Sequence, residues 1–338
     1  MKKTAVCSLL LASILASGSL FAGTSVTTPT SGGYTKFNGS GTDEVPSAFP
    51  FEFDLEAAYI GESAVKRGER VIRDFEELHT LARFIYTPRI MFGILRLGVA
   101  WERYSFDLPD RLGGPSNRII ALSYPGPVLG PVRLSTPQIP DTLQSVSAVI
   151  GLDTQLAEGI LIRLEAQPGF YGTDHLGGNT FNIPFVLGGT YIYSSNVQFI
   201  FGASIDYERK YPVFPGGGVR WRFAPQWMLD ATAPSPRLVY EMTPNLSLYA
   251  GANLKGGSYR TDKNFGNSRG DRRLNNAVLT YFEFRTGAGV EWKVSSDIRL
   301  TVEGGYMPYR TFDFHRADVR YRHDSGAPYG MIAVRAAF

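Results

Sequence analysis

The histidines are the residues of this 338-residue sequence best suited to acid–base or metal chemistry, and there are four of them. His175, His315 and His323 fall in predicted loops, whereas His79 shares the inward parity of its strand with Arg83. Imidazole acts as a general base or a zinc ligand only where other polar groups converge on it. The carboxylates beside His315 and His323 are sequence neighbours in a long loop, where such groups are usually solvated. We therefore predict no catalytic residue, no metal site and no cofactor.

Two glycine runs, at 216–218 and 256–257, could in principle cradle a phosphate. Neither is followed by a helix or by a P-loop lysine, so we interpret both as strand bends or points of close backbone approach. The single cysteine, Cys7, lies inside an N-terminal apolar segment. The rest of the chain therefore has no thiol chemistry and no disulfide to form.

Charged side chains alternate with apolar ones along several segments. In 278–293, Phe284, Val290 and Trp292 alternate with glutamates and an arginine, and 51–60 repeats the pattern with three carboxylates on one face. A period of two is typical of a β-strand with one polar and one apolar face. Because the charged face cannot contact lipid, we expect it to line the inside of a barrel. The candidate lumen-lining residues are Glu52, Asp54, Glu56, Arg83, Arg96, Glu102, Arg163, Glu165, Arg220, Arg222, Glu283, Arg285, Glu291, Lys293, Arg299 and Glu303.

Both signs of charge occur in this set, which leaves two interpretations open. Opposite charges that pair across the lumen would make a closed or narrow barrel whose ion network is structural. Opposite charges that segregate to facing walls would instead produce a transverse field in a water-filled pore and would orient dipolar solutes. A barrel of twelve to fourteen strands has a lumen wider than side chains readily fill.

The elements that must position these residues are strands of about ten residues or more, the length that a tilted strand needs to cross a bilayer. Short turns at 194–196, 224–226, 243–245 and 295–297 alternate with long connections at 107–142, 172–182, 209–216, 260–276 and 310–328. This is typical of periplasmic turns and extracellular loops. A soluble β-sandwich also alternates, but it does not explain aromatic residues next to the turns. The expected interface girdle is Tyr193, Trp221, Trp227, Tyr240 and Trp292.

The fold class that we predict is all-β: a transmembrane antiparallel up-and-down β-barrel of about fourteen strands. The count depends on a short hairpin, because twelve strands remain if 227–230 and 237–242 are not two real strands. Both counts are even, as both chain ends on the periplasmic side require.

The two ends of the sequence predict export. Lys2 and Lys3 precede an apolar run that is followed by small residues, so we expect a cleaved signal peptide at 1–22. A polar stretch at 23–50 is expected to be a flexible periplasmic lead-in, and 51–338 the barrel. Phe338 closes an amphipathic segment and is the expected assembly signal for the barrel-assembly machinery and periplasmic chaperones. Without Lys2 and Lys3 the formal net charge falls from +3 to about +1, which gives no electrostatic case for nucleic acid.

The chain resembles a family of uncharacterised outer-membrane β-barrel proteins that is classed as a domain of unknown function. The resemblance rests on segments 218–223 (GVRWRF), 227–230 (WMLD), 234–240 (PSPRLVY), 248–251 (LYAG) and 256–260 (GGSYR). It implies the barrel fold and the outer membrane of a Gram-negative-type bacterium. It implies no activity, and it assigns no role to Asp230, Arg237 or Arg260.

The function that we expect is a passive pore or solute-uptake channel with a mixed-charge lumen, in contact with outer-membrane lipid and open to a small solute. The long 107–142 connection could fold inward as a constriction. One alternative is a sealed structural or adhesive surface barrel whose loops, 310–329 above all, bind a partner. Another is a hydrophobic-compound transporter with a lateral opening at the short 227–242 hairpin. The sequence does not define an oligomeric state.

Overall fold

The computed structural model describes residues 50–68, 70–108 and 137–338. The expected signal peptide, nearly all of the lead-in, the role of Cys7 and most of the 107–142 connection therefore lie outside the described residues. Within the described part of the chain, no helix is long and apolar enough to cross a membrane.

The described residues form strands and two short 3-10 helices. The elements are β1 (Phe51–Arg67), β2 (Arg70–Tyr86), β3 (Arg89–Ile90), β4 (Gly93–Asp107), β5 (Thr142–Ala157), β6 (Ile160–Ala166), β7 (Gly169–Gly172), η2 (Gly178–Thr180), β8 (Phe181–Asn182), β9 (Phe185–Ile192), β10 (Val197–Ile205), β11 (Val213–Ala224), β12 (Trp227–Asp230), β13 (Arg237–Thr243), β14 (Leu246–Arg260), η3 (Arg272–Leu274), β15 (Val278–Lys293), β16 (Ile298–Phe314), β17 (Val319–Ser325) and β18 (Ala327–Ala337).

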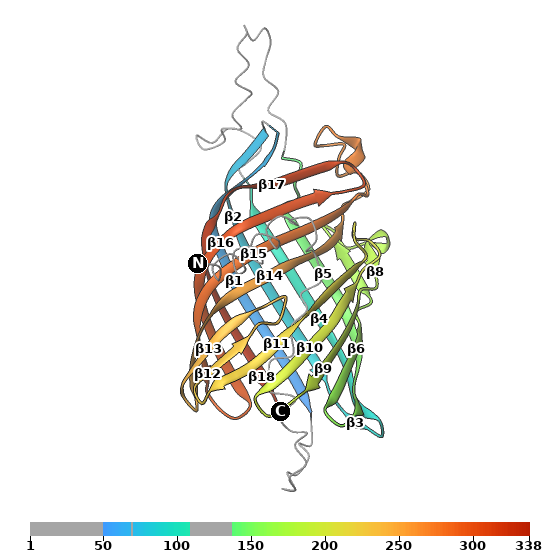
Figure 1. Cartoon of the computed structure of the whole chain (residues 1–338). Coiled ribbons are helices and arrows are strands. Elements are labelled where there is room, and N and C mark those ends of the chain that lie inside the picture. Colours follow the sequence, from blue (N-terminus) through green and yellow to red (C-terminus); the bar gives the residue numbers. More distant parts are fainter. Residues whose placement is uncertain (1–49, 69, 109–136) are drawn as a thin grey trace, which may run out of the picture.

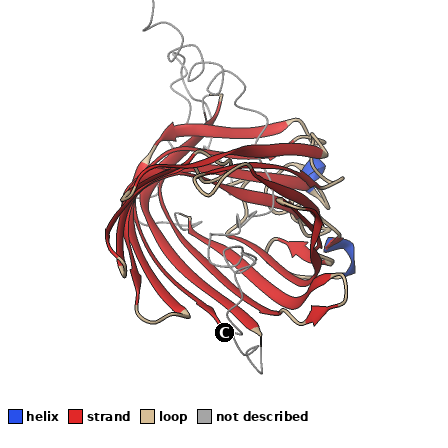
Figure 2. Ribbon diagram, turned by 60° about the horizontal axis from the view of Figure 1, so that its bottom comes forward, coloured by secondary structure: helices blue, strands red, loops and turns tan. Residues whose placement is uncertain are grey.

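These strands make one closed antiparallel barrel with 14 spans. Four spans are interrupted: β2 continues into β3, β6 into β7, β8 into β9 and β17 into β18. The ring closes where β18 pairs with β1, from Glu52 opposite Ala337 to Ile60 opposite Tyr329. Figures 1 and 2 show the ring from the side and from one end. The predicted fold class is confirmed, and the count is fourteen because β12 and β13 are both real strands.

Large apolar side chains cover the outside of the barrel. Val99, Phe201 and Ile332 are 58%, 48% and 51% exposed, while the alternate positions of the same strands point inward. An apolar surface that runs around a whole molecule is stable only against lipid. This distribution is the reverse of a soluble sandwich, which buries its apolar faces.

The two ends of the barrel differ. At one end, here called the turn end, short turns follow β9, β11, β13 and β15, and the expected girdle residues lie beside them. Trp227 lies between Phe223, on which it stacks, and Tyr240, whose ring is tilted against it, with ring centroids 6.3 and 4.9 Å apart. Tyr193 and Trp292 are 68% and 49% exposed there. The opposite end, here called the loop end, carries the long connections.

The predicted long loop at 310–328 is wrong. β16 continues to Phe314 and β17 begins at Val319, so only a tight turn separates them. The reason is that Arg310, Phe312 and Phe314 are fully buried on the inside of the barrel. Residues of β16 therefore still take buried inward positions after the sequence pattern of a membrane-spanning strand has ended.

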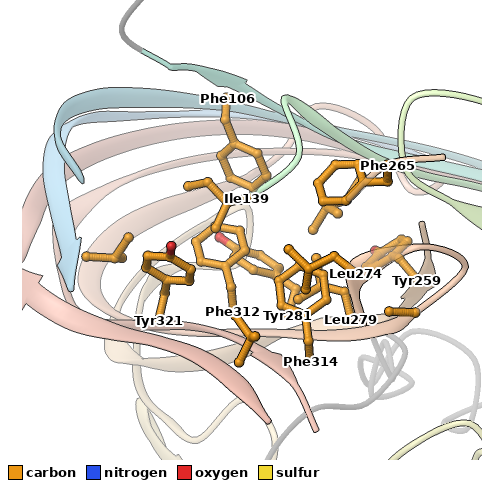
Figure 3. Packing of buried hydrophobic residues seen from close by; sticks show 14 of the residues in the cluster. Phe106, Ile139, Tyr259, Phe265, Leu274, Leu279, Tyr281, Phe312, Phe314 and Tyr321 are labelled. Atoms are coloured by element: carbon orange, nitrogen blue, oxygen red, sulfur yellow. The ribbon is translucent and has the colours of Figure 1, made fainter. Parts of the chain in front are cut away.

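An aromatic cluster fills the loop end on one side of the barrel (Figure 3). Phe106 and Tyr281 lie with ring centroids 5.6 Å apart, and Tyr281 and Phe312 lie 5.0 Å apart. These rings come from β4, β15 and β16, so facing walls meet. Side chains therefore fill this part of the interior, although a ring of fourteen strands is wider than side chains readily fill.

The strands from β9 to β13, here called the low wall, are shorter than their neighbours. They have 8, 9, 12, 4 and 7 residues, whereas β14, β15 and β16 have 15, 16 and 17. In Figure 1 the low wall ends below β17. At the loop end the two strands that flank it touch, because the Thr173 amide after β7 donates to the Arg260 carbonyl of β14 at 3.2 Å.

Candidate functional site: the charged interior of the barrel

The sixteen candidate residues take the inward positions of their strands, and most of them are paired. Lys293 follows the inward parity of β15 but lies exposed at the turn end. The others fall into five groups, each described below. Several partners of these residues were missed by sequence reasoning.

The upper network is the most buried group. Glu77 and Glu283 face Arg285 and Arg310, and all four side chains are at most 1% exposed. Arg285 Nη2 lies 2.5 Å from Glu283 and 3.3 Å from Glu77, and Arg310 donates to Glu77. The Tyr281 hydroxyl lies 2.7 Å from Glu77 and 3.0 Å from Glu283. Two carboxylates and two guanidinium groups therefore balance in a space without solvent, and they join β2 to β15 and β16.

The middle network contains His79. Its Nε2 lies 3.0 Å from Glu102 and its Nδ1 lies 3.3 Å from Glu56, while its ring stacks on Tyr104 at 4.3 Å. Lys255, which the sequence reading missed, reaches Glu56 from β14. His79 is fully buried among structural partners, which leaves no room for a substrate beside its ring.

A third network braces β1, β2, β4, β5 and β6. Arg96 donates two hydrogen bonds to Glu52, at 3.0 and 2.8 Å, and Arg83 donates to Glu165 at 2.6 Å. Arg163 makes a two-point contact with Asp153, at 2.6 Å for each bond. Bidentate arginine–carboxylate pairs fix geometry as well as charge.

The low wall carries its own pairs. Arg220 donates to Asp230 at 3.0 and 2.8 Å, and Arg222 donates to Glu241 at 2.7 Å through two nitrogens. Asp230 belongs to one of the segments that carry the family resemblance, and here it neutralises a neighbouring arginine. On the low wall the opposite charges are therefore paired between near strands, β11 with β12 and β13.

A cavity of about 160 Å³ lies between β1, β13, β14, β15, β16 and β18. Eight charged side chains line it, four of each sign: Asp54, Glu56, Glu291, Glu303, Arg237, Lys255, Arg299 and Arg335. Arg335 donates to Asp54 at 2.6 Å. Arg299 and Arg237 lie 3.3 and 3.7 Å from the same carboxylate, Glu291.

Glu303 in this cavity is held by two tyrosines. The Tyr249 and Tyr329 hydroxyls donate to its two carboxylate oxygens, at 2.6 and 2.5 Å. Both rings lie against glycines: a Cβ at Gly289 would come within 2.7 Å of the Tyr249 ring, and one at Gly287 within 2.4 Å of the Tyr329 hydroxyl. The absence of side chains at these two positions lets the rings reach Glu303.

A second glycine feature lies on the low wall. Gly188, Gly202 and Gly216 are paired side by side on β9, β10 and β11, and each occupies an inward position. A Cβ at Gly188 would have its nearest described neighbour at 4.0 Å, and one at Gly216 at 3.7 Å. This glycine strip gives the low wall a surface without side chains, opposite the filled half.

The 206–212 loop between β10 and β11 lies at the loop end above the low wall. Glu208 is bonded at 2.5 Å to Arg260 and at 3.2 Å to Arg316, on the far side of the low wall. Asn182 donates to Asp206 at 2.9 Å. The ion pairs of Glu208 thus latch the loop to the end of β14 and to the turn between β16 and β17.

The three remaining histidines do not form a site. His175 contacts Asp262 at 3.0 Å in exposed loops, and this hydrogen bond raises the pKa of His175. Burial lowers the pKa of His315 in the β16–β17 turn. Over 50–68, 70–108 and 137–338, no three histidine, cysteine or acidic residues gather in a way that could hold a metal ion.

A family model described as "Domain of unknown function (DUF6268)" matches residues 161–329, half of the chain. No match was found among curated proteins.

Several solved structures are similar in outline. The COG4313 outer membrane channel from Pseudomonas putida F1 is 9% identical, with 86% of this chain and 96% of that chain covered and a TM-score of 0.43. The P. putida toluene transporter TodX is 10% identical, with 87% and 91% covered and a TM-score of 0.42. The KdgM porin is 7% identical, with 85% and 99% covered and a TM-score of 0.33. At these values the similarities carry no weight for an activity.

Proposed function

Because this chain belongs to the DUF6268 family, whose description assigns no activity, we propose a function from the barrel itself: a passive outer-membrane channel for small polar solutes. The glycine strip on the low wall carries this proposal. One half of the interior is packed with ion networks and aromatic rings, whereas a Cβ at Gly188 or Gly216 would meet no described atom closer than 4.0 or 3.7 Å. A water-filled route along the low wall would pass this strip.

The polar character of the route follows from its neighbours. Arg220 and Asp230 lie on the same wall. Arg163 of β6 is paired with Gly188 of β9, so the Arg163–Asp153 ion pair lies beside the glycine strip. Paired charges present both donors and acceptors to a passing solute without a large net field. A polar solute loses less hydration there than it would against an apolar wall.

Single-channel recording tests the proposal directly. Refolded protein, with heat-modifiable gel migration as proof of folding, should give discrete openings in planar bilayers. Gly188→Trp and Gly216→Trp should lower the conductance because an indole would enter the open strip. Gly330→Trp is the matched control, since this glycine is exposed on the outer face of β18 with no neighbour within 4 Å.

A folded barrel without openings would overturn the channel and favour the sealed surface protein whose loops bind a partner. If the channel opens but neither Gly188→Trp nor Gly216→Trp lowers its conductance, the solute route lies elsewhere in the barrel.

A second candidate is lateral transport of apolar compounds, favoured by one observation. The edge of β14 that faces the low wall is hydrogen-bonded as far as Leu254, whose amide donates to Pro234 at 3.0 Å. Between Gly256 and Tyr259, no described strand pairs with that edge. Uptake of an apolar dye by vesicles, with no ionic conductance, would support this candidate over the polar channel.

We also propose that Phe338 is the assembly signal. Its amide donates to the Phe51 carbonyl at 2.9 Å and its ring is 58% exposed. The ring is therefore available for recognition by the barrel-assembly machinery while the backbone closes the barrel. Phe338→Ala should reduce insertion in cells but leave refolding of purified protein in detergent unchanged.

A further inference from the structure

The cavity between β1 and β13–β18 has an uneven distribution of charge partners. Among the described contacts, Glu303 accepts two tyrosyl hydrogen bonds but has no cation within 4.0 Å. Glu291, by contrast, has two arginines near it, Arg237 and Arg299. The cavity thus holds one carboxylate, Glu303, without a countercharge. It also holds two guanidinium groups that share a single carboxylate, Glu291.

These two groups lie along one strand. Arg299, Thr301 and Glu303 occupy successive inward positions of β16, and all three line the cavity. Neighbouring inward positions on a strand are about 6.6 Å apart. Arg299 and Glu303 are two such steps apart, so their Cα atoms are separated by about 13 Å. The Arg299 guanidinium reaches Glu291, which is paired with Thr301, so it lies nearer to Glu303 than its own Cα atom does.

The surroundings fix the two ends in different ways. Glu303 is immobilised by Tyr249 and Tyr329, which lie in the spaces left by Gly289 and Gly287. Arg299 and Arg237 keep unused N–H donors beside Glu291, and their side chains are 22% and 21% exposed. A carboxylate ligand would find donors at the Arg299 end, and an ammonium group would find an acceptor at the Glu303 end.

We propose that this cavity binds a small zwitterion whose ammonium and carboxylate groups are separated by several bonds, as in an ω-amino acid or a dipeptide. The carboxylate lies between Arg299 and Arg237, and the ammonium group lies at Glu303. The inference rests on the proposed function, because a solute reaches the cavity through the lumen. It names the substrate class that the channel would favour.

Three ligands of matched length test the proposal: 6-aminohexanoate, hexanoate and hexylamine. Isothermal titration of the refolded barrel in detergent should show that 6-aminohexanoate binds at least about tenfold more tightly than either singly charged ligand, since each lacks one charge-assisted contact. Glu303→Gln should weaken the zwitterion to the level of hexanoate, and Arg299→Gln should weaken it to the level of hexylamine. Arg103→Gln, on the exposed outer face of β4, is the control and should change nothing.

Equal binding of the three ligands by the unaltered protein overturns the proposal without any variant. So does tight binding that survives both substitutions in variants that fold. Because binding needs no conductance, a silent barrel that still selects 6-aminohexanoate would refute the channel but keep the site. A conducting barrel with no selectivity among the ligands would keep the channel and refute the site.

Discussion

Glu77→Gln should strongly destabilise the barrel. Glu77 accepts hydrogen bonds from Arg310 and Arg285, and the Tyr281 hydroxyl lies 2.7 Å away, all in a network that is at most 1% exposed. Glutamine has nearly the same shape but no charge, so the variant keeps the packing and leaves one net positive charge without water. Removing one partner of a buried ion network costs about 3–5 kcal/mol in unfolding free energy.

Urea titration in lipid vesicles, followed by tryptophan fluorescence, measures this loss. The control is Glu62→Gln, because Glu62 is exposed on the outside of β1 and its substitution should change the free energy by no more than about 0.5 kcal/mol. A double variant, Glu77→Gln with Arg310→Gln, restores charge balance and should lose less than the sum of the single variants. A loss below about 1 kcal/mol for Glu77→Gln, or strict additivity in the double variant, would refute the reasoning.

Three further predictions concern the loops and the girdle. Glu208→Gln removes the charge that latches the 206–212 loop, so open times in single-channel recordings should lengthen; unchanged gating would contradict the latch. His175 has a raised pKa because it donates to Asp262, so their ion pair is fully present below the ordinary histidine pKa and is lost as the pH rises through the raised value. An NMR titration should therefore show a lower His175 pKa in Asp262→Asn, and identical values in both proteins would exclude the pairing. Trp227→Ala removes a stacked girdle ring and should lower the urea stability by about 1–3 kcal/mol, whereas no change would place Trp227 outside the interface.

Alternation predicted the barrel because one face of each strand meets lipid and the other does not. Glu283 and Arg285 could be assigned to the inside from their neighbours alone, since β15 keeps strict alternation over its length. Glu77 shares the parity of His79 and Arg83, so alternation places it on the inside as well, although it was not among the predicted lumen-lining residues. The irregularity at Asp74, which has a φ of 55°, lies before this stretch and does not change its parity.

Arg310 could not be assigned to the inside from alternation alone. A register shift between β15 and β16 changes the inward parity of β16, so Glu303 and Met307 face inward at odd positions and Arg310 and Phe312 at even ones. No residue type marks such a bulge in the sequence. The pairing of Lys255 with Glu56 was beyond reach for a further reason, because it depends on which walls approach each other across the lumen.

The number of strands therefore does not set the size of the passage in this barrel. Fourteen strands enclose a wide ring, but Lys255–Glu56 and Arg310–Glu77 tie strands that are not neighbours, β14 to β1 and β16 to β2, and so brace one side of that ring. The remaining space lies against the low wall, where Gly188 and Gly216 present no side chain. The proposed route, bounded by glycines on one side and by fixed ion pairs on the other, would be narrow and rigid. Its conductance should be well below that of an unobstructed fourteen-stranded ring, and it should change more with substitutions at the glycine strip than with substitutions in the buried networks.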